Sequence, residues 1–380
     1  MEYIKTDNRL SLFRAFLLLM ITFLIIGNGE ALAQKKSKKK NKNWEIELGI
    51  SSFYDNNVLK YSEKYLYRFD HGQDEGRFHI NTYDDFIINP SFQATYTFRV
   101  FGKLKSKING SFNRKIYTVN DIKSWNYFSL GFSQYLKKGG SFKLYYSHIP
   151  NFYIRHFRDN DWVDVVGYTP EAFQPMGFAK DSYGFWYKRK FIKNTQIKLS
   201  FSYLKYFYNE HFTEYDCNNL VYEIKLYQPV HKKIKLSFAY QFVISDAKGH
   251  DEEHETRDGS DDSDGSYNED LFIFGFNWTM PRYFNHYNKF DLQCRVQKRY
   301  FSSKHYLELD PTHAGRIDDN IRLYATYYIK LSKELKLSVF YNHYFRESNT
   351  SAEANKIYLS NEKNYSQYQL GLKINYQFKT

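Results

Sequence analysis

The sequence is poor in cysteine and in proline. Of its 380 residues, two are Cys and seven are Pro, beside 37 Tyr and 34 Phe. Two cysteines, Cys217 and Cys294, are too few for a secreted domain built on disulfides, and we expect no bond between them. Tyr and Phe favour strands and also suit an interface between water and lipid. The composition therefore favours a β-protein without deciding its surroundings.

Long apolar runs are absent after the first residues. The one such run, residues 15–26, follows basic residues and precedes an Ala-Leu-Ala motif at 31–33. This pattern predicts a secretory signal peptide over residues 1–33, cleaved near Ala33/Gln34. The next segment, 34–43, is Lys-rich and is expected to be a disordered basic periplasmic tail. No later window has the apolar length of a transmembrane helix, so the exported chain is either a soluble protein or a membrane barrel.

Positive charge is in excess, and the excess lies outside the signal segment. The formal net charge is +12 and the mean hydropathy is −0.67. Residues 1–33 hold equal numbers of basic and acidic side chains, so the excess belongs to the part that follows. It indicates either plain solubility or an anionic partner or solute. Nucleic acid is not expected as that partner, because the charge is spread along strands and no reading motif is present.

Apolar residues recur at every second position through the rest of the chain. In IKLSFAYQFVI, residues 234–244, every second residue from Ile234 is apolar. This is the period of a strand with one apolar face, and no stretch has the period of an amphipathic helix. Fourteen strands are predicted near residues 44–54, 86–100, 103–117, 124–136, 141–153, 180–190, 195–209, 218–228, 233–245, 270–279, 288–301, 319–331, 334–346 and 365–378.

Long and short connections alternate between these strands. Long ones such as 55–85, 154–179 and 246–269 are separated by short joints such as 191–194. Outer-membrane barrels have short periplasmic turns and long outer loops, and an even strand count returns both termini to the periplasm. In lipid only a closed barrel satisfies the backbone of every strand. We therefore predict an all-β fold over residues 44–380, a transmembrane antiparallel up-and-down β-barrel of about 14 strands, with about 12 to 16 compatible.

The last strand resembles the C-terminal signature of Gram-negative outer-membrane β-barrels. In YQLGLKINYQF, residues 368–378, apolar residues alternate and the segment ends on the aromatics Tyr376 and Phe378. In that class the barrel-assembly machinery recognises the signature. The resemblance therefore implies that this machinery and the outer-membrane lipid are partners of the chain. It also implies a porin-like class, without a specific family. The style of the sequence, and the segment YDNNVLKYSEKYLYRF at 54–69, are similar to barrels of the Bacteroidota.

In such a barrel the apolar face of each strand meets lipid and the polar face lines an aqueous lumen. The predicted inward positions carry many Lys and Arg but few acidic residues, namely Glu45, Glu47, Glu223 and Asp291. Rings of basic side chains select anions in pores. The alternative is that these side chains are simply solvated or contact lipid phosphates. The candidate selectivity residues are Lys225, Arg295, Arg299, Arg322 and Lys373.

The most biased stretch is the acidic segment 249–270. It is not an EF-hand, because Ser260 and Leu271 stand where that loop needs ligands. Two hypotheses remain, a mobile solvated loop and a looser calcium site. His250 and His254 add a transition-metal alternative. The calcium hypothesis uses Asp258, Asp261, Asp262 and Asp264.

No catalytic motif accompanies these features. The sequence has no G-x-S-x-G nucleophile motif and no zinc-ligand spacing, so an enzyme is not expected. The leading hypothesis is a porin-like outer-membrane channel for small hydrophilic solutes, with anions favoured. The alternative is a non-conducting surface barrel whose loops bind a partner in adhesion, assembly or a structural role, with segment 154–179 as the plug. The oligomeric state does not follow from the sequence.

Overall fold

The structure is a computed structural model that describes residues 43–100, 104–191, 194–283 and 286–379. The expected signal peptide, residues 1–33, lies outside these ranges, as does the expected basic tail except for Asn43. Both expectations stay predictions.

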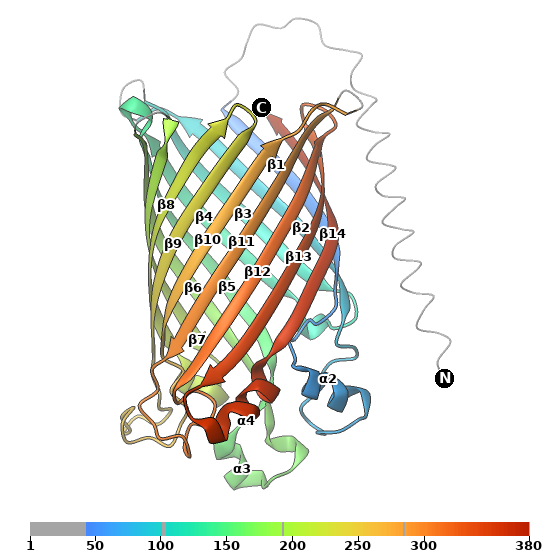
Figure 1. Ribbon diagram of the computed structural model, residues 1–380, viewed down its shortest axis with the longest axis vertical. Helices are drawn as coiled ribbons and strands as arrows, with labels where there is room; N and C mark the ends of the chain where they lie inside the picture. The colour runs from blue at the N-terminus through green and yellow to red at the C-terminus, as the bar shows by residue number, and fades with distance from the viewer. Residues whose placement is uncertain (1–42, 101–103, 192–193, 284–285, 380) are drawn as a thin grey trace, which may run out of the picture. The chain divides into compact units, whose positions relative to one another are not determined.

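Fourteen antiparallel strands form one closed barrel, in which each strand pairs with the next and β14 pairs with β1 (Figure 1). The fold predicted from the alternation is confirmed. No sheet edge is left open, so every strand has hydrogen-bonding partners on both sides. The strands are β1 (Trp44–Asp55), β2 (Asp85–Phe98), β3 (Ser106–Tyr117), β4 (Trp125–Tyr135), β5 (Ser141–Arg158), β6 (Phe173–Lys190), β7 (Gln196–Tyr208), β8 (Cys217–His231), β9 (Ile234–Ala247), β10 (Tyr267–Thr279), β11 (Tyr287–Phe301), β12 (Arg316–Lys330), β13 (Leu335–Thr350) and β14 (Tyr365–Lys379).

The two ends of the barrel differ. One end, which we call the turn end, carries the start of β1, the end of β14 and the short joints (Figure 1). The other, the loop end, carries the long connections and three short α-helices that the sequence pattern did not predict. The helices are α2 (Glu63–Asp70), α3 (Asn160–Val166) and α4 (Glu353–Lys363), and the 3₁₀ turns are η1 (Asp121–Lys123), η2 (Lys137–Gly139), η3 (Pro170–Ala172) and η5 (Glu210–Tyr215).

Among the described residues, no helix is both long enough and apolar enough to cross a membrane.

The outer face of the barrel is apolar and the inner face is polar. On β14, Leu370 keeps 54% of its surface exposed on the outside. Its neighbour Gln369 points inward and donates a hydrogen bond to Asp55 of β1 at 2.7 Å. Large apolar side chains stand exposed on most other strands in the same way, for example Leu144, Leu199 and Phe274. Because exposure of this much contiguous apolar surface is unfavourable in water, the outer face fits hydrocarbon.

The seam that closes the barrel depends on a glycine. Phe53 of β1 and Phe340 of β13 point inward and meet edge to face, with ring centroids 5.7 Å apart. Gly371 of β14 lies between them in register. A Cβ at Gly371 would lie 2.7 Å from Cζ of Phe340 and closer still to Phe53, so only glycine fits without displacing the ring pair.

The first loop, residues 56–84, packs against the inner wall of the barrel. Its Val58, Leu59 and Tyr61 are buried against inward side chains of β1, β2, β3 and β5. The segment expected to act as a plug, 154–179, is strand at both ends, because β5 continues to Arg158 and β6 begins at Phe173. The helix α3 that remains in that loop has no buried residue. The inner wall is therefore narrowed by loop 56–84.

Candidate functional site: the lumen

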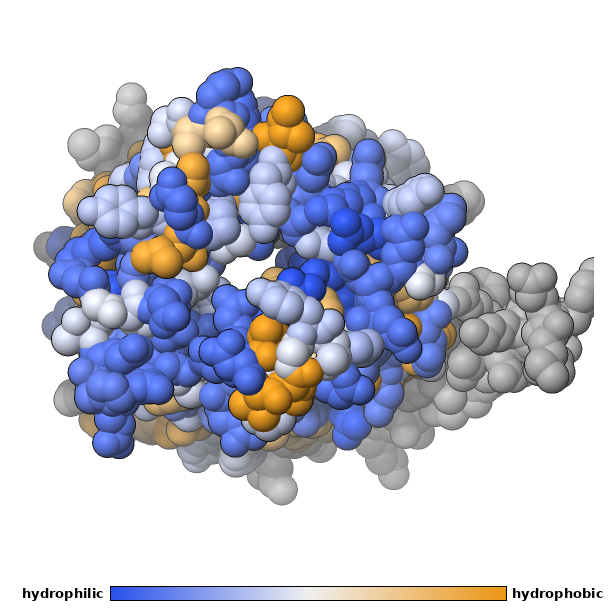
Figure 2. Space-filling view, turned by 90° about the horizontal axis from the view of Figure 1, so that it is seen from below, coloured by the Kyte–Doolittle hydropathy of each residue, from blue (hydrophilic) through white to orange (hydrophobic). Residues whose placement is uncertain are grey.

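The barrel encloses a lumen that is open towards the loop end. Figure 2 views the molecule from that end and shows an opening at the centre, ringed mainly by hydrophilic side chains. Described residues of the inner surface line a cavity of about 520 Å³ near the turn end and another of about 820 Å³ near the loop end. We refer to them as the turn-end cavity and the loop-end cavity.

Polar side chains line most of the turn-end cavity, and the charged ones are mainly basic. Lys188, Lys225 and Lys235 line it, together with Tyr227, Tyr324 and Tyr328. Among the described residues that line it, the single carboxylate is Asp291. That carboxylate is engaged by Lys289 at 2.6 Å, so it does not neutralise the other lysines.

The five basic residues proposed from the sequence all lie on inner-face positions. Arg295 and Arg322 are directly opposite each other on β11 and β12. Arg322 donates a hydrogen bond to Gln297 at 2.6 Å, and Arg295 lies over the ring of Tyr324 at 5.0 Å. Two like charges in directly opposed positions repel, and water or an anion in the lumen offsets that repulsion.

Unlike Arg295 and Arg322, Lys225 and Lys373 do not lie on adjacent strands. Lys225 is opposite Lys198 on β7, and Lys198 is paired with Glu223 at 2.9 Å. Lys373 is flanked by serines in register, Ser51 on β1 and Ser338 on β13. The structure therefore places the candidates on a common inner wall and does not bring them together into one cluster.

Arg299 differs from the other four. Its guanidinium donates to Glu269 at 2.8 Å and 3.0 Å, and it lies 3.9 Å over the ring of Tyr267. Among the described residues, the other four candidates have no carboxylate within the 4.0 Å of an ion pair. Arg299 is thus neutralised locally, whereas the others leave their charge to the lumen.

Four inward acidic residues were missed by the sequence analysis. They are Asp55, Asp85, Glu269 and Asp318, and each is almost fully buried at the loop end of its strand. Asp318 is held by Arg316 at 2.6 Å. Asp85 accepts hydrogen bonds from the backbone N–H groups of residues 118–120 and so shapes the loop between β3 and β4. These carboxylates therefore hold the loop end of the barrel together through ion pairs and hydrogen bonds.

The loop-end cavity is lined by more basic than acidic side chains. The basic ones come mainly from loop 56–84, β3, η1, β5, β12, β13 and α4, and the acidic ones come from β1, from α3 and the residue before it, from η5, from the β9–β10 loop and from α4. The basic lining residues are Lys60, Arg77, Lys115, Lys123, Arg155, Arg158, Arg299, Arg316, Arg346 and Lys363. The lining carboxylates are Asp55, Asp159, Asp161, Glu214, Asp262 and Glu362.

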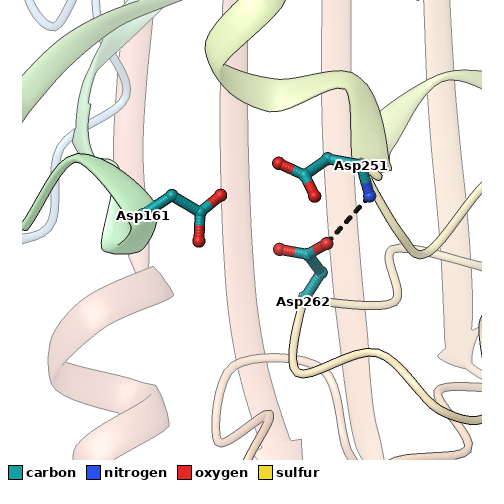
Figure 3. A group of neighbouring side chains, drawn as sticks. All are labelled: Asp161, Asp251 and Asp262. Carbon is teal, nitrogen blue, oxygen red and sulfur yellow. Dashed lines mark hydrogen bonds between the residues drawn. The ribbon is translucent and has the colours of Figure 1, made fainter. Parts of the chain in front are cut away.

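Three carboxylates from two loops meet beside this cavity. Asp161 of α3 faces Asp251 and Asp262 of the β9–β10 loop, and one ligand oxygen from each lies within 4.8 Å of the others (Figure 3). The backbone N–H of Asp251 donates to Asp262 at 2.9 Å. Burial, then the neighbouring Asp251, raises the pKa of Asp161 to about 7 and that of Asp262 to about 6. This is a carboxylate set that could hold a divalent cation.

The four residues of the calcium hypothesis do not form one group. Only Asp262 belongs to the trio in Figure 3. Asp258 is exposed and pairs with Lys304 at 3.1 Å, Asp261 is exposed, and Asp264 is buried and accepts the N–H of Ser266. Asp161 was missed because it is far away in sequence. Calcium binding stays a prediction, now resting on a different set of residues.

The aromatic residues of the expected assembly signal lie at the turn end of β14. Tyr376 and Phe378 have ring centroids 6.0 Å apart. They are on the outer face with Leu370, opposite Leu48 and Ile46 of β1. Their recognition by an assembly machinery stays a prediction.

Comparisons with known proteins give barrel structures. No family model matches the chain, and no curated protein matches it. A bacterial polysaccharide outer membrane secretin shares 8% identity over 90% of this chain and 100% of its own, with a TM-score of 0.45. The outer membrane channel DcaP of Acinetobacter baumannii shares 10% identity over 90% of this chain and 100% of its own, with a TM-score of 0.44. An anion-selective porin from Comamonas acidovorans shares 11% identity over 88% of this chain and 98% of its own, with a TM-score of 0.41. At this level of likeness nothing follows about the solute.

Proposed function

We propose that the protein is an outer-membrane channel that passes small hydrophilic solutes and prefers anions. The observation that carries the proposal is an open lumen whose mid-strand basic residues keep their charge. Lys225, Arg295, Arg322 and Lys373 face that lumen without an ion-pair partner among the described residues. A positive potential in a narrow aqueous path raises the local concentration of anions and lowers that of cations.

The outer face supports placement in a membrane. Its exposed leucine and phenylalanine side chains form the lipid-facing side that a closed barrel needs. In the proposed orientation the turn end faces the periplasm with both termini, after cleavage near Ala33/Gln34, and the loop end faces outward. The barrel-assembly machinery is the proposed insertion partner.

Reconstitution in planar bilayers tests the channel directly. We expect steady openings. In a potassium chloride gradient, the reversal potential should be shifted from zero towards the equilibrium potential of chloride. The double variant Lys225→Gln/Arg322→Gln should move that potential towards zero, because it removes lumen charge. Lys304→Gln is the matched control, since it removes the charge of a loop lysine paired with Asp258. Absence of openings, or equal shifts in the control, would contradict the proposal.

One observation favours the alternative of a surface barrel that binds a partner. Apolar side chains stand exposed on the outer loops, with Tyr168 83%, Tyr306 79% and Ile357 74% exposed. Figure 2 shows hydrophobic patches on that end of the molecule. Bilayers that stay silent with correctly folded protein would favour this alternative over the channel.

A further inference from the structure

Loop 56–84 carries a lysine into the loop-end cavity on a fixed turn. Lys60 has a φ of +54°, in the left-handed region that a residue with a long side chain seldom adopts. The turn around it is held by the buried Asn57, whose amide donates to the carbonyl of Tyr61 and whose oxygen accepts the Tyr61 N–H, both at 2.8 Å. Strained conformations that the surroundings enforce cluster at binding sites, and here the result is an exposed lysine that lines the cavity.

Arg155 of β5 locks this turn and lines the same cavity. Its Nη2 donates to the carbonyl oxygen of Leu59 at 2.5 Å and to that of Lys60 at 3.3 Å. The guanidinium lies 4.6 Å over the ring of Tyr61. Its Nε is buried and has no hydrogen-bond partner among the described residues. A buried N–H of a charged group without a partner is costly, and it indicates that an acceptor belongs there.

Two more basic groups reach the cavity from the other side of the barrel seam. Arg346 of β13 donates to Asn320 at 3.2 Å and stands 3.8 Å from Asp318. Asp318 is already engaged by Arg316 at 2.6 Å. Lys363, at the end of α4, lines the cavity and has no carboxylate within ion-pair distance among the described residues. The four groups thus come from four separate parts of the chain.

The nearest carboxylates are occupied elsewhere. Glu362, next to Lys363, is bound by Lys64 and by the hydroxyl of Tyr65. Asp55 accepts hydrogen bonds from Gln367 at 2.8 Å and from the N–H of Asn57 at 3.1 Å. The positive charge of the cavity wall is therefore not cancelled by its own neighbours.

We propose that the loop-end cavity contains a binding site for a multivalent oxyanion, a phosphate or a polycarboxylate, formed by Lys60, Arg155, Arg346 and Lys363. Several like charges facing one cavity repel, and an anion between them converts that repulsion into attraction. Arg155 supplies a free donor for an oxyanion, and the lysines supply mobile charges. The volume of about 820 Å³ is in the range of small-ligand sites. The inference rests on the proposed function only in that the site lies on the path of the channel.

The electrostatic surroundings of Lys363 agree with this geometry. Burial, then the charges of Arg316, Arg155 and Arg346, lowers its pKa to about 7, against the opposing effect of Glu362. His313 also lies within electrostatic reach of this lysine. A bound anion would favour the charged form of Lys363.

Calorimetric titration of the full-length barrel in detergent at constant ionic strength tests the site. The probes are pyrophosphate and citrate, which distinguish phosphate from carboxylate chemistry, with chloride as the monovalent reference. We expect saturable binding of at least one probe and none of chloride. Lys60→Asn, which keeps a residue tolerant of positive φ, and Lys363→Gln should each weaken binding about tenfold or more.

The matched control is Lys356→Gln on the same helix α4, where the lysine is exposed and stands 3.6 Å from Glu353. It should bind like the unaltered protein. No saturable binding of either probe, or an equal loss in the control, overturns the site. Steady conductance without such binding would overturn the site and leave the channel standing. Binding that Lys60→Asn and Lys363→Gln abolish, in a barrel that does not conduct, would support the site and overturn the channel.

Discussion

Replacing Leu323 by Arg should destabilise the barrel far more than replacing Thr326 by Arg. Both residues lie on β12, three positions apart. Leu323 is on the outer face with 37% of its surface exposed, whereas Thr326 is on the inner face and lines the turn-end cavity. Thr326 is opposite Asp291 of β11. The two variants therefore place the same cation on the two faces of one strand.

The magnitude follows from the position of Leu323 in the strand. It belongs to the outward run of β12 that begins at Ile321 and ends at Ile329, so it lies within the hydrocarbon of any bilayer that the barrel spans. A cation at the bilayer midplane on a barrel costs about 2–4 kcal/mol. That cost lowers the folding equilibrium constant roughly 30- to 700-fold. At position 326 the new guanidinium is hydrated and faces Asp291, and a cross-strand pair of opposite charge contributes about 0.2–1 kcal/mol in favour.

Reversible unfolding in lipid vesicles with guanidinium chloride, followed by tryptophan fluorescence, measures both free energies. We expect the unfolding midpoint of Leu323→Arg to fall clearly and that of Thr326→Arg to stay near the unaltered value. A Thr326→Arg variant that is destabilised as much as Leu323→Arg would refute the assignment of lipid to the outer face and water to the lumen.

Three further predictions concern the cavity, the seam and the outer loops. Since the pKa of Lys363 is about 7, its ammonium group loses its proton as pH rises through that value. Binding of sulfate, which is a dianion over this whole pH range, should therefore weaken above pH 7. In Lys363→Gln, sulfate binding should be independent of pH. Gly371→Ala should lower the free energy of unfolding by about 1–3 kcal/mol through overpacking, whereas Gly110→Ala, where the nearest atom to a new Cβ is 3.9 Å away, should change it little in the same vesicle assay. Calcium should slow hydrogen exchange of the β9–β10 loop and of α3, and Asp262→Asn should remove that protection; equal exchange with calcium and with chelator would exclude a cation at the carboxylate trio.

The strands and their faces were predictable from the sequence because side-chain alternation is a local property of extended chain. The pattern that places Leu370 outside and Gln369 inside needs no knowledge of the neighbouring strands. The even number of strands and the alternation of long and short connections then predicted that the strands close into a barrel. The loops offered no such rule, because α2, α3 and α4 and the inward packing of loop 56–84 depend on contacts between segments far apart in the chain.

The missed carboxylates show where the pattern stops being informative. Asp55, Asp85, Glu269 and Asp318 each lie one residue beyond a predicted strand end, yet all four belong to strands. Above the lipid both faces of a strand meet water or polar loops, so the apolar alternation ends before the hydrogen-bonded ladder does. The sequence therefore underestimated the inward negative charge at the loop end.

This error changes which basic residues matter. The charge that a solute meets is the charge left after internal pairing, and a count of Lys and Arg along the strands does not provide it. Arg299, a candidate from the sequence, is held by Glu269, and Arg316 is held by Asp318. Lys60 and Lys363 were outside the predicted strands, yet they face the cavity without a carboxylate partner among the described residues. Selectivity in this barrel should therefore respond more to the loss of Lys60 or Lys363 than to the loss of Arg299, although Arg299 is one of the five candidates from the sequence.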